Sequence, residues 1–291
     1  FALEFIRRDA RVAGFWGCNS DTVPSNGIKI ASNAYIDVDA GDIAGTSDDG
    51  LNNADSITFR NATGSGALVT SDMSGTGGAI TVDGASALAT GTAALISDCE
   101  NGDLFQITGI SETALAHAEG ASANDSAELS KKYLAGARVY EARQTTYCVA
   151  DGIGKDKDGK PIPSLRRAYG KNSVSDCETG EELLEGIENM QILYGEDTDA
   201  DADGANGDGT ANRYVAFGAS GLDIDRIVSV RISVLVRSIN NNLTTEPSPY
   251  IYPPWANPPI STTPDEDDKH LRKIFTTTIT LRNKTLRNKA G

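Results

Sequence analysis

The sequence predicts an α+β fold, with one amphipathic helix at the N-terminus and a larger body of short β-strands. Apolar residues recur three and four positions apart along the first turns, which is the spacing of one helix face; they are Leu3, Ile6, Ala10 and Ala13. Later segments alternate apolar and polar residues, as strands do. Only 39% of the 291 residues are hydrophobic and 30 are glycine, which suits short strands joined by long polar loops. We expect those strands to form the surface on which the helix packs.

The first helix is expected to end at Gly14 and Gly17, because glycine is common at helix C-termini. Its start is unusual, since Phe1 is not an initiator methionine and no N-cap residue precedes it. A processed or trimmed chain would explain this start, and the sharper interpretation is that the helix is the lower half of a longer one whose apolar upper half has been removed. The sequence contains no run of 18 apolar residues and no recognisable signal peptide, so as given it is not expected to span a membrane.

The body of the chain contains many segments with strand character, and 227–238 is the most convincing because its apolar positions are mostly β-branched. Asn101-Gly102 predicts a hairpin turn between two of them. Short helical pieces are expected at 126–133 and 181–190. The expected strands are 56–60, 67–70, 79–82, 93–99, 103–110, 137–149, 164–169, 190–194, 212–217, 227–238 and 273–283.

Two long stretches are expected to be irregular. Residues 19–53 are rich in Asp, Gly, Ser and Asn, and residues 240–268 contain seven of the ten prolines. No internal repeat and no sharp change of composition marks a second domain.

The charge of the chain limits its partners. It carries 41 acidic and 26 basic residues, a formal net charge of −15. Such a surface disfavours binding to nucleic acid or to anionic lipid. It favours an extracytoplasmic domain, or one that binds cations.

Four cysteines at wide spacing indicate two disulfides and an oxidising compartment. A zinc site is not expected, because there is no Cys-x-x-Cys pair and there are only two histidines. Three pairings are possible, and we predict the sequential one, Cys18–Cys99 and Cys148–Cys177. The second pair is favoured because its cysteines flank an expected hairpin of strands around 139–149 and 164–169.

The densest chemical feature is an acidic stretch at 196–208, with six carboxylates in thirteen residues. Asp199-x-Asp201-x-Asp203-Gly204 matches the first half of a calcium loop, but the twelfth position is Thr210 rather than a bidentate Glu. Further acidic residues would have to complete the shell. The candidate calcium ligands are Asp197, Asp199, Asp201, Asp203 and Asp208. The alternative is a solvated acidic hairpin tip. No other cofactor is expected.

No catalytic motif is found. The sequence lacks a Gly-x-Ser-x-Gly, a phosphate-binding glycine loop and a His-Glu-x-x-His. We interpret His117 and His270 as plain surface histidines, and Asp156-Lys-Asp-Gly159 as a turn. The protein is not expected to be an enzyme.

Several short motifs, in this order, resemble the PilW-type minor pilins of type IV pili. They are Arg11-Val-Ala-Gly-Phe-Trp-Gly-Cys18, Ile96-Ser-Asp-Cys99 with Leu104-Phe-Gln-Ile107, Leu184-Glu-Gly-Ile-Glu-Asn-Met190 with Leu193-Tyr-Gly195, Gly209-Thr-Ala-Asn-Arg-Tyr-Val215, Val228–Arg237 and Phe275–Asn283. The Leu-Glu-Gly-Ile-Glu element also resembles the J-type pseudopilins of type II secretion. The start departs from the family, because the cleavage motif, the Phe-Thr-Leu-x-Glu start and the apolar half-helix are absent. This fits a truncated domain.

The resemblance implies a pilin-like fold, with the amphipathic helix packed on antiparallel β-sheet. Residues 1–17 would be the C-terminal part of the pilin helix, and 18–291 the globular head. It also implies a non-enzymatic subunit of the tip complex that primes pilus assembly. Its partners would be other minor pilins, the major pilin and a candidate tip adhesin, which links the protein to cell adhesion. It would reside in the inner membrane and periplasm before assembly and in the extracellular fibre, or fimbrium, afterwards.

Two alternatives remain open. One is a J-type minor pseudopilin of a type II secretion system, built on the same scaffold. The other is a secreted calcium- or carbohydrate-binding module. Its sugar platform would be formed by Tyr250, Tyr252 and Trp255 in the proline-rich loop, although such aromatic residues more often pack a loop down.

Overall fold

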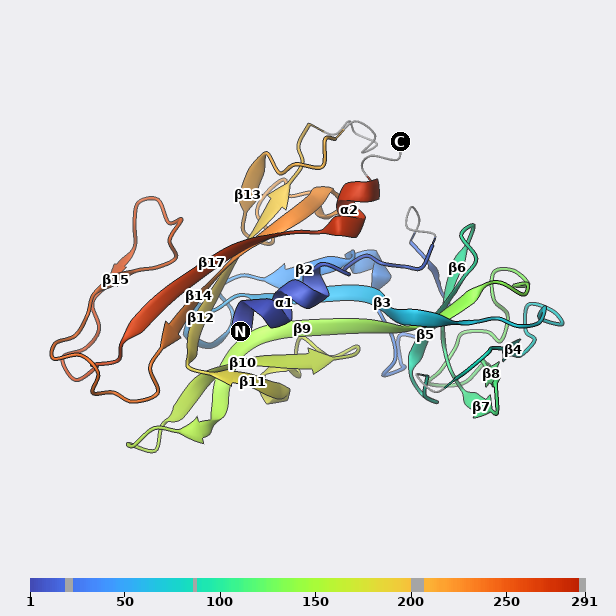
Figure 1. Cartoon of the computed structure of the whole chain (residues 1–291), viewed down its shortest axis with the longest axis horizontal. Coiled ribbons are helices and arrows are strands. Elements are labelled where there is room, and N and C mark those ends of the chain that lie inside the picture. Colours follow the sequence, from blue (N-terminus) through green and yellow to red (C-terminus); the bar gives the residue numbers. More distant parts are fainter. Residues whose placement is uncertain (19–22, 86–87, 200–206, 288–291) are drawn as a thin grey trace.

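The computed structural model describes residues 1–18, 23–85, 88–199 and 207–287. Within these ranges seventeen strands form four sheets, and the only α-helices are α1 (Ala2–Ala10) and α2 (Arg282–Arg287) (Figure 1). The predicted α+β class, a pilin-like fold with an N-terminal helix on a sheet, is therefore wrong, because the chain is mostly β and is built of several sheets. Four 3₁₀ turns complete the helical content: η1 (Val38–Ala40), η2 (Leu51–Asn53), η3 (Cys177–Thr179) and η4 (Ile224–Arg226).

The main sheet has eight strands and is organised around the long strand β9 (Arg138–Lys155). Residues 144–150 of β9 are all buried, so both faces of the sheet are covered there. β9 pairs antiparallel with β3 (Ser56–Leu68), β5 (Ala93–Ser97) and β10 (Pro161–Tyr169). Beyond them lie β2 (Ile43–Thr46), β6 (Gly102–Gln106), β1 (Ser25–Asn26) and β11 (Glu181–Glu185).

The second sheet has four antiparallel strands in the order β13 (Arg213–Val215), β12 (Ile187–Glu196), β14 (Ile227–Arg237) and β17 (Arg272–Thr280). The helix predicted at 181–190 is wrong, because this segment forms β11 and the start of β12. Gly186 stands between them at φ +82, a conformation that a helix does not contain. At this glycine the chain leaves the main sheet and enters the second one.

The largest core contains side chains from both sheets and from α1. Ile6, Ala10 and Ala13 are buried in it, and Leu3 is partly buried against it. Their neighbours in this core include Phe59 of β3, Tyr147 of β9, Ile192 of β12 and Val230 of β14. Burying a large apolar side chain contributes about 1.5–3 kcal/mol, so Ile6 fixes α1 firmly to the strands.

Smaller elements cover the ends of the molecule. A three-stranded sheet, β4 (Ile80–Thr81), β8 (Ala114–Ala116) and β7 (Gly109–Ser111), packs over a second core. The proline-rich segment contains the ribbon of β15 (Tyr250–Ile251) and β16 (Ser261–Thr262).

The helical piece expected at 126–133 does not form. Its polar side chains bond elsewhere: Ser130 Oγ donates to Asp103 Oδ2 at 2.6 Å, and Tyr133 Oη donates to the same atom at 2.7 Å. Asp103 lies on β6, so these bonds hold the segment against the main sheet in an irregular form. No helix in the described ranges is long and apolar enough to cross a membrane.

Candidate functional site

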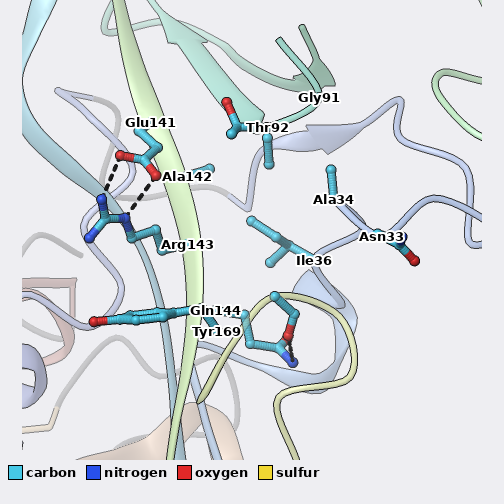
Figure 2. Close-up of a pocket in the computed structure, with 12 residues that line it drawn as sticks. Asn33, Ala34, Ile36, Gly91, Thr92, Glu141, Ala142, Arg143, Gln144 and Tyr169 are labelled. Atoms are coloured by element: carbon cyan, nitrogen blue, oxygen red, sulfur yellow. Dashed lines mark hydrogen bonds and ion pairs between the residues drawn. The ribbon is translucent and has the colours of Figure 1, made fainter. Parts of the chain in front are cut away.

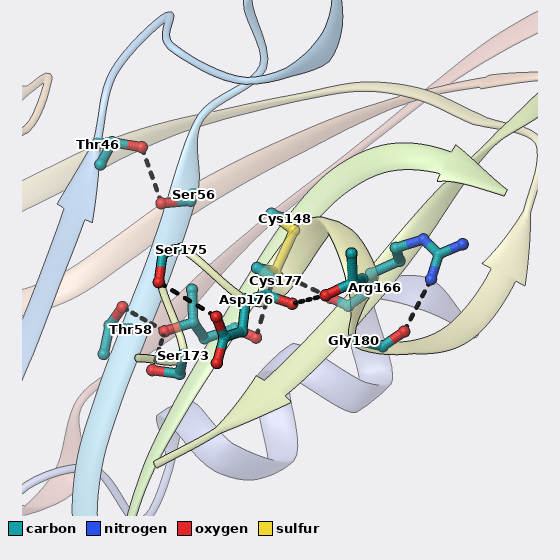
Figure 3. The surroundings of a disulfide bond; sticks show 12 residues. Thr46, Ser56, Thr58, Cys148, Arg166, Ser173, Ser175, Asp176, Cys177 and Gly180 are labelled. Atoms are coloured by element: carbon teal, nitrogen blue, oxygen red, sulfur yellow. Dashed lines mark hydrogen bonds between the residues drawn. A yellow bond between two sulfur atoms is a disulfide. The ribbon is translucent and has the colours of Figure 1, made fainter. Parts of the chain in front are cut away.

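Two disulfides fasten the chain in the sequential pairing. Cys18–Cys99 joins the segment after α1 to the turn between β5 and β6. Cys148–Cys177 joins β9 to η3, with Cα atoms 6.1 Å apart (Figure 3). Loops of this length give each disulfide about 3–5 kcal/mol in the chain-entropy model. The chemistry suits an oxidising compartment.

The loop before Cys177 is also held by buried hydroxyl groups (Figure 3). Ser173 Oγ lies 2.8 Å from Thr146 Oγ1, which in turn lies 2.7 Å from Thr58 Oγ1. Because Thr58 and Thr146 stand on β3 and β9, this chain of hydrogen bonds ties the loop to two strands of the main sheet. The disulfide therefore closes a segment that is already well fixed.

Exposed apolar side chains lie on and beside α1: Phe1 precedes the helix, Phe5 lies on it and Val12 follows it. Phe5 and Val12 are 38% and 42% exposed, and Phe1 is fully exposed. Positions 1, 5, 8 and 12 fall on one side of a helix, and the fourth member is the exposed Arg8. The spacing of three and four residues that identified the buried face of the helix could also have identified this exposed side. Exposed apolar side chains on one side of an element are a feature of interaction surfaces, and here the charged Arg8 stands between Phe5 and Val12.

The inner side of α1 is fixed by polar bonds as well as by packing. Tyr147 Oη donates to Asp9 Oδ2 at 2.7 Å, and burial together with the Asp9 charge raises the pKa of Tyr147 well above its usual value. Asn283 Nδ2 at the end of the chain donates to the Ala13 carbonyl at 3.0 Å. These hydrogen bonds and the buried side chains together hold α1 in place, so the position of its outward side is fixed.

The structure brings part of the predicted calcium set together. One carboxylate oxygen from each of Asp197, Asp199 and Asp208 lies within 4.8 Å of the others. Asp201 and Asp203 lie outside the described residues. Asp197 is buried, whereas Asp199 and Asp208 are exposed. The cluster stands where the chain leaves β12 and before it enters β13.

The histidine prediction is wrong, because both side chains are buried. His117 Nε2 lies 2.9 Å from the Gly78 carbonyl oxygen, and its ring meets Phe105 edge-on. His270 Nδ1 lies 2.7 Å from the Ser238 carbonyl oxygen. These carbonyl partners come from distant segments, so the polar sequence around each histidine gave no sign of its burial.

The aromatic residues of the proline-rich loop pack that loop down. Tyr252 is buried, and its Oη donates to the Ser233 carbonyl on β14 at 2.7 Å. The Arg272 guanidinium lies over the Tyr250 ring at 5.3 Å. Trp255 is partly buried. Tyr252 therefore has no free face to offer a sugar.

A hollow of about 530 Å³ opens beside β9, between residues 33–36 and the end of β10 (Figure 2). Its polar groups are engaged with one another: Arg143 donates to both Glu141 oxygens at 2.8 and 2.9 Å and lies over the Tyr169 ring. Gln144 Nε2 donates to Ser173 Oγ at 3.1 Å. The hollow has the character of a packed surface rather than of a set of converging reactive groups.

Part of the chain matches a known protein-family model. Residues 146–283 match the model described as type IV pilus-assembly protein W. The matched part starts within β9 and contains the Cys148–Cys177 disulfide, the whole second sheet and the acidic cluster. Searches of curated proteins and of solved structures each returned no match.

Proposed function

We propose that the protein is a non-enzymatic minor pilin, because residues 146–283 match the family model of type IV pilus-assembly protein W. Its role is that of a structural subunit in the tip complex that primes assembly of the fibre. The partners would be other minor pilins, the major pilin and a tip adhesin.

The main support for this proposal is helix α1, which has one side buried in the core and apolar residues exposed on the other. Its inner face is locked into the core by Ile6 and Ala10, while Phe5 and Val12 point outward. A rigid helix with a free apolar stripe can pack against a helix of a neighbouring subunit without first being ordered, which lowers the entropic cost of association. Such a surface supports assembly rather than catalysis.

The disulfides support a periplasmic and extracellular location, and the net charge bears on the partners. Both disulfides suit the periplasm, where the subunit would stay at the inner membrane before assembly, and the extracellular fibre afterwards. The net charge of −15 disfavours nucleic acid as a partner.

The test is complementation of a strain that lacks the gene. The full-length protein carrying Phe5→Asp and Val12→Asp should fold, because substitutions of exposed residues usually change stability by less than about 0.5 kcal/mol. Surface piliation should nevertheless fall strongly. Ile260→Asp, at an apolar position of the proline-rich segment that is 55% exposed, serves as the control and should leave piliation intact.

The outcomes separate the candidate functions. Normal piliation with the double variant would contradict the proposal. Normal piliation together with reduced secretion of exoproteins would favour the J-type pseudopilin.

A further inference from the structure

Asp197 is a buried carboxylate, and one of its oxygens has no hydrogen-bond partner in the described part of the chain. The residue follows directly on β12, and its exposed fraction is 0%. Its Oδ2 accepts a hydrogen bond from the Gly209 backbone N–H at 2.7 Å. Its Oδ1 is buried and has no hydrogen-bond partner among the described residues. An ionised carboxylate in this position is costly unless a cation or a donor completes its surroundings.

Two more carboxylates meet Asp197. Oxygens of Asp199 and Asp208 come within 4.8 Å of one another and of an Asp197 oxygen. In the described part of the chain, none of the three forms an ion pair with Lys, Arg or His. The neighbouring cations are engaged: Arg213 pairs with Glu196 at 2.6 Å, and Arg226 with Asp223 at 3.4 Å. Three carboxylates therefore converge without a salt bridge between any of them and a described basic side chain.

The backbone around the cluster is well fixed. Glu196 and Arg213 pair across β12 and β13, and the Asn212 N–H donates to the Glu196 carbonyl at 2.9 Å. Asn212 Oδ1 accepts from the Thr198 N–H at 2.7 Å, and the Asp197 N–H donates to the Arg226 carbonyl at 3.0 Å. Both ends of the connection are thus held where the carboxylates converge.

We propose that Asp197, Asp199 and Asp208 bind a divalent cation of the calcium class. Carboxylate oxygens are the ligands that hard cations prefer, and calcium accepts irregular geometry that magnesium does not. Backbone carbonyls or water would fill the remaining positions. The ion neutralises the charge of the buried Asp197 carboxylate. It also links the end of β12 to the segment around Asp208 that leads into β13.

This arrangement differs from the calcium-loop motif of the sequence. The anchor is the buried Asp197, which precedes the Asp-x-Asp-x-Asp pattern, together with Asp208 from the far side of the connection. The site goes beyond the proposed function and does not depend on it, because a minor pilin could fold and assemble with or without the ion.

The test titrates calcium into the full chain, freed of metal with a chelator, by calorimetry and by thermal melting. We expect one site per chain with a Kd of about 10⁻³ M or tighter, and a melting temperature that rises by a few degrees in tenfold excess of calcium. Magnesium at matched ionic strength should raise it less.

The decisive variant is Asp199→Asn with Asp208→Asn. Both positions are exposed, so the variant should fold, and it should bind calcium at least tenfold more weakly. In chelator the variant should melt no lower than wild type, because removing two charges relieves the repulsion among the three carboxylates. In calcium it should melt lower than wild type, because only wild type is stabilised by the bound ion. Asp197→Asn should also lose binding, but it alters a buried group. Glu178→Gln with Glu266→Gln removes the same charge at two exposed positions and should leave the response to calcium unchanged.

Three results would overturn the proposal. They are no calcium-dependent shift in the wild type, equal shifts with calcium and magnesium, and a response to calcium that the Asp199→Asn, Asp208→Asn variant keeps.

Discussion

At the scale of single residues, Asp55 joins the two large sheets. It stands just before β3, and its two carboxylate oxygens accept the backbone N–H groups of Asp48 at 2.9 Å and Ile192 at 2.6 Å. Its own N–H donates to the Met190 carbonyl at 2.8 Å. Burial, with a smaller contribution from the charges of Asp48 and Asp49, raises the pKa of Asp55 from 3.8 to about 6, although the two backbone bonds oppose the shift.

Asp55 should therefore make stability depend on pH between about 4 and 6. Its pKa is higher in the folded than in the unfolded chain, so the folded protein binds more protons in this window, and the free energy of unfolding falls as pH rises. The loss is at most about 3 kcal/mol. Denaturant titrations from pH 4 to 7 should show a smaller fall for Asp55→Asn than for wild type. The exposed Asp265→Asn is the control. Equal slopes for wild type and Asp55→Asn would refute this.

At the scale of elements, Gly186 decides where one sheet ends and the next begins. Its N–H donates to the Pro163 carbonyl and its carbonyl accepts from the Arg237 N–H, both at 2.8 Å. With φ at +82, an added Cβ would lie 2.7 Å from the Arg237 carbonyl oxygen. The apolar spacing of Leu183, Leu184 and Ile187 predicted a helix, because a local pattern does not contain these distant partners. In the structure Leu184 pairs with Leu165, and Ile187 with Val236.

Gly186→Ala should be strongly destabilising. The left-handed backbone alone costs about 1–2 kcal/mol for alanine, and the clash with a backbone oxygen adds to it, so we expect a loss of about 2–3 kcal/mol. Gly218→Ala isolates the first contribution, because Gly218 has φ +78 but no atom within 4 Å of the added Cβ. The two variants are compared by denaturant unfolding. Similar losses would show that the contact with Arg237 does not matter.

At the scale of the whole molecule, sequence patterns located the buried helix face and both disulfides, but they missed most contacts between distant strands and loops. The spacing of Ile6, Ala10 and Ala13 marked a helix face that is buried, and the scattered motifs resemble the family whose model matches residues 146–283. The fold class was wrong because a single helical stripe at the start says nothing of how many sheets follow. The unpaired oxygen of Asp197 was not visible in the sequence, since its burial depends on how β12 meets the segments around Gly209 and Arg226.

In the described residues, α1 is thus packed on a body built mainly of β-strands. α1 shares the largest core with strands of both large sheets, and Asn283 at the far end of the chain bonds to Ala13.

The most direct test of the central claim is photo-cross-linking in piliated cells, with a photoreactive amino acid at position 5 of the full-length protein. We predict adducts with other pilin subunits from position 5, identified by mass spectrometry, and none from position 260, which serves as the control. Absence of pilin adducts from position 5 in cells that still assemble pili would contradict the claim that α1 is the assembly surface.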